Sequence, residues 1–262
     1  MSVLPRGNAA TSADWPDLVA ELDRWGEAGQ IASLWWRDDD AVAPTPELAS
    51  LLRVAGDVPL ALAVIPAEAD PELPGFLRTI WHIAVMQHGW QHANHAAPGT
   101  KKSEFPASRP AAAVASELAE GHARLAELFG PRALPVLVPP WNRFAAEFVP
   151  LLTKIGIEGL SSMASRDALP LAADIVQMDV HVDLVAWNDG RQFIGTEAAL
   201  TGLVRHLRAR RPGSADRDAA IGILTHHLVM DRATAGFLDR LIATVEQHKA
   251  ARWATPAELL VR

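Results

Sequence analysis

Cysteine and tyrosine are both absent from the 262 residues of the chain. Without cysteine the protein has no disulfide bond, no thiolate nucleophile and no cysteine-ligated zinc site, so any metal must be bound by histidine and carboxylate side chains. An excess of positive charge is also lacking, because the formal net charge is −7 and no basic segment stands out. The composition therefore argues against nucleic acid and anionic membranes as partners.

Long apolar runs are lacking as well. The first thirty residues carry charged side chains from Arg6 to Arg24 and contain no apolar core of a signal peptide. No later stretch approaches the length needed to cross a bilayer. These absences favour a cytoplasmic protein with no membrane partner. The chain also contains no P-loop, GxGxxG, GxSxG or HExxH motif.

What the sequence does contain is a regular alternation of short β patterns and helical patterns. Apolar residues make up 49% of the chain and charged residues 21%, the balance of a globular protein with a sizeable core. We expect strands at 32–36, 59–66, 82–86, 134–141, 158–161, 174–183, 220–225 and 251–254. We expect helices at 15–28, 46–54, 71–80, 111–129, 145–155, 196–210 and 232–248.

This alternation predicts an α/β fold built from parallel βαβ units. About eight strands in a chain of this length favour a distorted (β/α) barrel of about seven or eight mostly parallel strands over an open sheet. No repeat or linker divides the chain, so we expect a single domain over residues 1–262.

Polar or proline-containing clusters follow five of the expected strands. They are RDDD (37–40), QHGWQH (87–92), PPWNR (139–143), VHVDLVAW (180–187) and LTHH (224–227). Because the reacting groups of parallel barrels lie at the ends of the strands, these clusters are expected to meet in one site.

The segment QHGWQHANH, residues 87–95, has three of the ten histidines within eight positions. His88 and His92 are four residues apart, which in a helical turn would put both imidazoles on one face, with Cβ atoms roughly 5–6 Å apart. Two neutral imidazoles and a carboxylate of the RDDD segment could bind one divalent ion and leave a position for water. The alternative is a solvated RDDD turn and an ordinary polar loop.

In their order along the chain, these clusters resemble the five motifs of the polysaccharide deacetylase family, also called the NodB-homology or carbohydrate esterase 4 family. RDDD resembles the family's aromatic-Asp-Asp motif, HGWQH its His-Ser/Thr-x-x-His motif, and VPPWN (138–142) its Arg-x-Pro-Tyr-like motif. Asp183 with Trp187 resembles the fourth motif and LTHH the fifth. The resemblance implies a NodB-like domain that deacetylates an N-acetylated sugar or oligosaccharide with the help of a metal ion.

The resemblance also implies a role for individual residues. Asp38 takes the place of the general base that accepts a proton from the attacking water, and Asp39 takes the place of the metal-binding carboxylate. His88 and His92 take the places of the two imidazole ligands. His226 takes the place of the general acid that protonates the leaving amine. For two nitrogens and one oxygen, Zn²⁺ is the first choice of metal, and Co²⁺, Ni²⁺, Mn²⁺ or Fe²⁺ are also allowed.

Four further residues are assigned to the site with less specific roles. Asp183 would hold His226 in the right tautomer or bind Arg143. Trp141 and Trp187 could line a sugar pocket, although tryptophans near a barrel mouth often serve only in packing.

The sequence departs from the family pattern at three positions. Gly89 stands where the family has Ser or Thr, so a hydroxyl that would steady the loop is missing. Asp40 stands where the family has glycine, which leaves the register of the three aspartates open by one residue. Val138 stands where the family has the arginine that pairs with the catalytic aspartates, and Arg37 or Arg143 could replace it.

Three other functions fit part of the pattern. The same fold could hydrolyse a small cyclic or linear amide, which a cytoplasmic location favours. The loss of the third-motif arginine also fits a catalytically impaired sugar-binding relative, but binding alone needs neither Asp38 nor His226. Two histidines and one carboxylate also form the facial triad of Fe(II) oxygenases, which usually have a tight His-x-Asp/Glu pair on an all-β scaffold. The sequence leaves the exact substrate, the physiological metal and the oligomeric state open.

Overall fold

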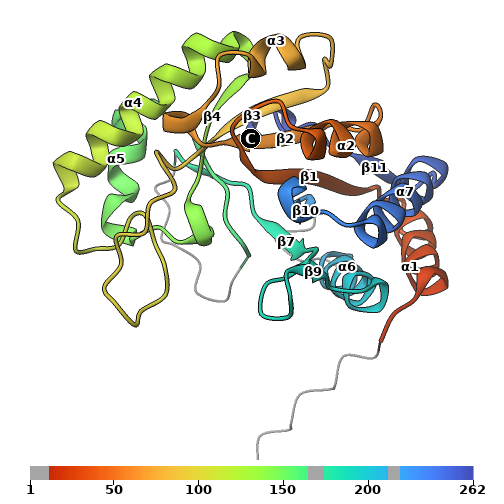
Figure 1. The fold of residues 1–262 in the computed structure, drawn as a ribbon. Helices are drawn as coiled ribbons and strands as arrows, with labels where there is room; N and C mark the ends of the chain where they lie inside the picture. The colour runs from red at the N-terminus through yellow and green to blue at the C-terminus, as the bar shows by residue number, and fades with distance from the viewer. Residues whose placement is uncertain (1–11, 165–173, 212–218, 262) are drawn as a thin grey trace, which may run out of the picture.

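A computed structural model of the protein describes residues 12–164, 174–211 and 219–261. Its α-helices are α1 (Trp15–Glu27), α2 (Pro46–Ala55), α3 (Leu73–Leu77), α4 (Ala111–Phe129), α5 (Val149–Lys154), α6 (Thr196–Arg210) and α7 (Arg232–Gln247). The strands of the main sheet are β1 (Ala32–Ala41), β2 (Leu60–Val64), β3 (Ile83–His88), β4 (Ala133–Val138), β5 (Gly159–Leu160), β6 (Val176–Gln177), β7 (Val180–Asp183), β10 (Ile221–Thr225) and β11 (Ala251–Trp253). A separate hairpin consists of β8 (Val185–Ala186) and β9 (Gln192–Phe193). Figure 1 shows the helices around the outside of the curled sheet.

The main sheet has nine strands in the order β6-β5-β4-β3-β2-β1-β10-β7, with β11 paired to β1. All of these pairings are parallel. The two ends of the sheet, β6 and β7, follow each other in the chain, and a parallel bridge from Met163 to Val180 connects the segment after β5 with β7. The expected α/β fold, a distorted barrel of mostly parallel strands, is therefore confirmed. Nine strands replace the eight expected because the predicted strand 174–183 is divided into β6 and β7.

The ends of the helices follow from local capping. At α1, the Asp14 side chain accepts a hydrogen bond from the Asp17 backbone N–H, and the Asp17 side chain accepts one from the Asp14 N–H. At α2, the Thr45 side chain accepts from the Leu48 N–H. Helix α4 ends at Gly130, whose φ of 56° is readily adopted by glycine.

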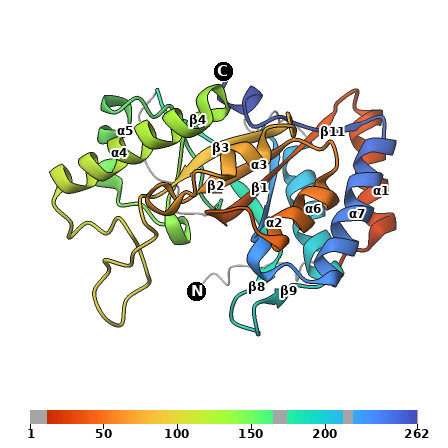
Figure 2. The same ribbon diagram turned by 45° about the horizontal axis from the view of Figure 1, so that its top comes forward.

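The core is divided by the alternation of side chains along the strands. Trp36 packs in the large apolar cluster between the sheet and helices α1, α2, α6 and α7. Trp35 packs in a second cluster to which strands all round the barrel contribute, which places that cluster inside the barrel. A third cluster lies between the sheet and helices α4 and α5. Figure 2 shows the strands from a second direction, with α4 and α5 on one side and α1, α2, α6 and α7 on the other. Among the described residues, no helix is both long enough and apolar enough to span a membrane.

Candidate active site

Strand β1 continues through the RDDD segment as far as Ala41, beyond the predicted end at residue 36. Since successive side chains of a strand point to opposite faces, Arg37 and Asp39 share the inner face of the barrel with Trp35, and Asp38 lies on the outer face. At Asp40 the alternation breaks, because its φ is 72° and the pairing of β1 with β2 shifts register between Asp38 and Ala41. The three adjacent aspartates therefore point to three different surroundings.

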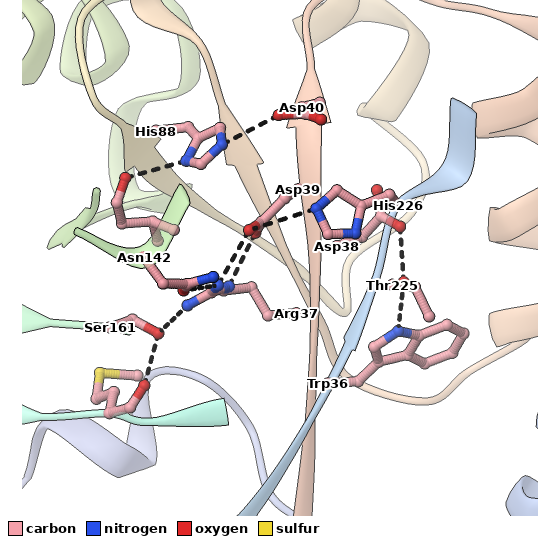
Figure 3. A network of polar contacts seen from close by, with 12 residues as sticks. Trp36, Arg37, Asp38, Asp39, Asp40, His88, Asn142, Ser161, Thr225 and His226 are labelled. Carbon is pink, nitrogen blue, oxygen red and sulfur yellow. Dashed lines mark hydrogen bonds and ion pairs between the residues drawn. The ribbon is translucent and has the colours of Figure 1, made fainter. Parts of the chain in front are cut away.

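Asp40, His88 and His92 form a group whose ligand atoms all lie within 4.8 Å of one another. The Asp40 Oδ1 atom is 3.1 Å from His88 Nε2 and 3.4 Å from His92 Nε2. His88 Nδ1 donates a hydrogen bond to the Val138 carbonyl, 3.0 Å away, so in the neutral ring Nε2 carries the lone pair (Figure 3). Lone pairs of nitrogen and oxygen thus converge on one space, and two imidazoles with one carboxylate fit a divalent cation.

The aspartate in this group is not the one expected. The sequence assignment put Asp39 with the imidazoles, whereas the structure puts Asp40 there. The alignment of the three aspartates with the motif is therefore shifted by one residue. The two histidines also do not share a helical turn. His88 is the last residue of β3, and His92 lies in the following loop with a φ of 55°. Their rings are brought to a centroid distance of 5.1 Å by the turn of this loop.

Asp39 is paired with Arg37 instead. The guanidinium donates from Nε to Asp39 Oδ1 at 2.8 Å and from Nη2 to Asp39 Oδ2 at 3.0 Å, and both side chains are almost fully buried. Arg37 also donates to Ser161 Oγ at 2.7 Å and Asn142 Oδ1 at 2.9 Å, as Figure 3 shows. Arg37 thus provides a buried arginine next to an aspartate of the site although position 138 is valine.

Arg143, the other candidate for this replacement, lies elsewhere in the site. Its guanidinium donates to the Lys102 carbonyl at 2.9 Å, and its side chain lines the cavity described below.

Asp38, the expected general base, is completely buried on the outer face of β1. Its carboxylate accepts hydrogen bonds from Thr225 Oγ1 at 2.6 Å and from His227 Nδ1 at 2.5 Å. Thr225 in turn accepts from the Trp36 indole N–H (Figure 3). Asp38 is absent from the residues that line the cavity, so its surroundings are those of a structural hydrogen-bond network.

His226 lies on the inner side of the site, with Nε2 at 4.0 Å from Asp39 Oδ2. Its ring makes an edge contact with Trp187 at a centroid distance of 4.6 Å. Asp183 accepts hydrogen bonds from the Trp187 indole N–H at 2.7 Å and from the Val185 backbone at 3.0 Å. Asp183 therefore holds Trp187, and this tryptophan, rather than a hydrogen bond from Asp183, supports His226. Within the described residues, His226 Nδ1 has no hydrogen-bond partner.

One cavity of about 1270 Å³ contains these groups. Asp39, Asp40, both imidazoles of the group, His226, Asp183 and both candidate tryptophans line it. The five non-glycine residues with positive φ in the described part of the chain all line it too: Asp40, His92, Trp141, Asn142 and Arg191. Such backbone conformations are costly and cluster at functional sites, which marks this cavity as the candidate active site.

The charges in the cavity interact strongly. Burial alone would raise the pKa of Asp40, but the hydrogen bond and charge of His88, with His226 and His92 nearby, hold it well below the usual range. Burial opposes the charging of His88, yet the charges of Asp39 and Asp40 raise its pKa. Burial and the neighbouring His88 lower the pKa of His92, and burial raises that of Asp183.

No protein-family model matches the chain, and no curated protein matches it in sequence. Solved structures, in contrast, match most of its length. A Mycobacterium smegmatis protein assigned to the polysaccharide deacetylases has a TM-score of 0.61 and 17% identity, over 95% of this chain and 92% of that one. The chitin deacetylase of Colletotrichum lindemuthianum has a TM-score of 0.55 and 17% identity, over 88% of each chain. A family 4 acetyl xylan esterase from Clostridium thermocellum, solved with a cobalt ion, has a TM-score of 0.53 and 14% identity, over 87% and 89%.

These similarities show that the chain has the fold of the carbohydrate esterase 4 polysaccharide deacetylases, at low sequence identity. The resemblance drawn from the five motifs is therefore confirmed for the fold.

Proposed function

We propose that the protein is a metal-dependent deacetylase that hydrolyses the amide bond of an N-acetylated sugar or oligosaccharide in this cavity. One observation carries the proposal. A carboxylate and two imidazoles suited to a cation, an arginine-paired aspartate and a further histidine all line one cavity of a chain with the carbohydrate esterase 4 fold. Solved structures with this fold include a chitin deacetylase, and another contains cobalt.

In the proposed metal centre, Asp40, His88 and His92 are the ligands. The Nδ1–H of His88 is already used by the Val138 carbonyl, so its Nε2 is available for coordination. A divalent ion bound there would lower the pKa of water and polarise the carbonyl of the substrate. We propose Zn²⁺ as this ion, because the ligand set has two nitrogens, one oxygen and no sulfur.

Asp39 is the general base in this proposal, in place of Asp38. It lines the cavity, and Arg37 fixes the orientation of its carboxylate through two hydrogen bonds. Each carboxylate oxygen keeps a second lone pair that can accept a proton from the attacking water. Asp38 is not among the residues that line the cavity, so its carboxylate does not face a water bound there.

His226 is the general acid that protonates the leaving amine. With its Nε2 4.0 Å from Asp39 Oδ2, the base and the acid lie close enough to act on one carbonyl group. Trp187 packs against the His226 ring and Trp141 against the His92 ring, at 4.6 and 4.4 Å between centroids. Both tryptophans line the cavity, so each offers an aromatic surface on which a sugar ring can pack.

The pairing of Arg37 with Asp39 favours an active enzyme over a purely sugar-binding relative. Loss of the third-motif arginine was the reason to consider such a relative, and Arg37 supplies a guanidinium to the cavity-lining aspartate from β1.

The test is acetate release from N-acetylglucosamine oligomers by protein that has been stripped with a chelator and reloaded with Zn²⁺, Co²⁺, Ni²⁺ or Mn²⁺. We expect metal-dependent release, and a fall of about 10²–10⁴-fold in the Asp39→Asn and His226→Gln variants, the usual contribution of a general base or acid. Simple cyclic and linear amides are assayed in parallel. Turnover of these amides alone would replace the sugar substrate, and no turnover with any loaded metal would overturn the proposal.

A further inference from the structure

Glu104 is a completely buried carboxylate in the same segment between β3 and α4 that carries His92. Its Oε1 accepts a hydrogen bond from the Gln91 backbone N–H at 2.8 Å, and its Oε2 accepts one from the Trp90 N–H at 3.2 Å. Arg109 donates to the backbone carbonyl of Glu104, not to its carboxylate. Burial raises the pKa of Glu104, although the backbone N–H groups that face it act in the opposite direction. A buried carboxylate is costly, so its retention here calls for an explanation.

The position of this carboxylate explains the glycine at position 89. Gly89 has a φ of +61°, and a Cβ atom added there would lie 1.9 Å from Glu104 Oε2 and 2.7 Å from the Pro140 ring. Serine or threonine, the residues of the resembling motif, would collide with Glu104 at this point. The carboxylate of Glu104 therefore occupies the space that a side chain at position 89 would enter.

The hydrogen bonds of Glu104 act directly on a proposed ligand. Trp90 and Gln91 are the two residues before His92, and His92 has a φ of 55°, a conformation that persists only when the surrounding structure holds it. From the other side, Gln87 Nε2 donates to the Gly89 carbonyl at 3.0 Å. The loop is thus fixed at consecutive residues immediately before His92.

We infer that Glu104 is a positioning residue for the metal centre. Its carboxylate holds the 89–92 loop so that the His92 imidazole lies beside Asp40. It does so in a chain that lacks the hydroxyl expected at position 89 to steady this loop. The inference rests on the proposed metal site. Glu104 is not itself a ligand in it, because its two oxygens accept backbone N–H groups and it lies outside the group of Asp40, His88 and His92.

The test is the affinity of the full chain for Zn²⁺, measured by competition with a chromophoric chelator, together with the absorption spectrum of the Co²⁺-loaded protein. Glu104→Gln offers one acceptor and one donor where two N–H groups need two acceptors. We expect Zn²⁺ binding about 10–100-fold weaker, the usual effect of removing a group that orients a ligand, and an altered Co²⁺ spectrum. Should Glu104→Gln not fold, Glu104→Asp takes its place, because the shorter side chain cannot reach both N–H groups.

Glu21→Gln is the matched control. Glu21 is also a completely buried carboxylate, but it lies in α1 and pairs with Arg24 and Arg211. Both variants are expected to lower the urea midpoint of the metal-free protein, and only the Glu104 variant to lose Zn²⁺ affinity. Parental affinity and an unchanged Co²⁺ spectrum in the Glu104 variant would overturn the inference, as would an equal loss of affinity in both variants. If the parent binds no Zn²⁺, or if Asp40→Asn binds Zn²⁺ as the parent does, the proposed metal site is wrong. The inference about Glu104 is then wrong as well.

Discussion

Replacing Arg37 by methionine removes a buried guanidinium that makes four hydrogen bonds: two to Asp39 and one each to Ser161 and Asn142. The Arg37 side chain has no exposed surface and that of Asp39 is only 3% exposed, so solvent replaces little of what the pair provides. Methionine leaves the Asp39 carboxylate, the Ser161 hydroxyl and the Asn142 carbonyl without this donor, while it keeps most of the side-chain volume.

The cost of this change can be worked out from the burial of the pair. Removing one partner of a buried, hydrogen-bonded ion pair destabilises a protein by about 3–5 kcal/mol. At about 2–4 °C of melting temperature per kcal/mol for a domain of this size, we expect a fall of about 6–20 °C. The double variant Arg37→Met/Asp39→Leu has no orphaned carboxylate and is expected to regain most of this loss.

The assay is thermal unfolding of both variants, followed by circular dichroism in the presence of a chelator so that metal binding does not contribute. Arg37→Lys serves as a further comparison, because it keeps the charge but not the fork that bonds both carboxylate oxygens. A melting temperature of Arg37→Met equal to that of the parent would refute the view of Arg37 and Asp39 as one buried unit. A double variant that melts as low as the single variant would refute it too.

Further predictions concern the three aspartates, metal removal and acid stability. Equilibrium dialysis against Zn²⁺, with metal content measured by mass spectrometry, should give about one ion per chain in the parent and in Asp39→Asn, and a large loss in Asp40→Asn. Asp38→Asn should keep the ion but lose about 2–4 kcal/mol of unfolding free energy in urea, because its buried carboxylate accepts two short hydrogen bonds. Burial and the adjacent Arg210 lower the pKa of His181 to about 3, so below about pH 6.5 the unfolded chain takes up a proton that the folded one does not. Stability should therefore fall by about 1 kcal/mol per pH unit from pH 6.5 towards pH 4, and a His181→Gln variant with the same slope would contradict this.

The bounds of an element could be predicted best where the element is long and strongly patterned. Helix α4 was expected at 111–129 and has these bounds, since it follows Pro110 and ends at Gly130. The hairpin of β8 and β9 was missed because each strand has only two residues, too few for any periodicity.

The choice among the three aspartates was predictable in part. Side chains alternate between the two faces of a strand, as Trp35 and Trp36 do, and continuing that alternation puts Arg37 and Asp39 inside the barrel and Asp38 outside. The missing information was that β1 continues to Ala41. The turn of Asp40 towards His88 has no sequence signal, because it depends on a register shift between β1 and β2.

Glu104 was not recognised because its role depends on a contact across thirteen residues of irregular loop, between its Oε1 and the N–H of Gln91. The signal available in the sequence was Gly89, in a position where a hydroxyl residue was expected. A glycine at such a position indicates that something else fills the space, but only the folded loop identifies the group that does so.

The position of Arg37 shows how an arginine–aspartate pair can form in this fold without an arginine at position 138. Residues i and i+2 of a strand share a face, so an arginine two residues before Asp39 can reach its carboxylate from the same strand, without any residue of β4. Val138 can then be apolar, and it packs inside the barrel with Trp35 and Met86. The ion pair is thus built from β1 alone. The VPPWN segment (138–142) contributes the side-chain oxygen of Asn142, which accepts a hydrogen bond from Arg37, and not a cationic side chain. A sequence comparison that expects an arginine at position 138 finds valine there and does not register an ion pair formed within β1.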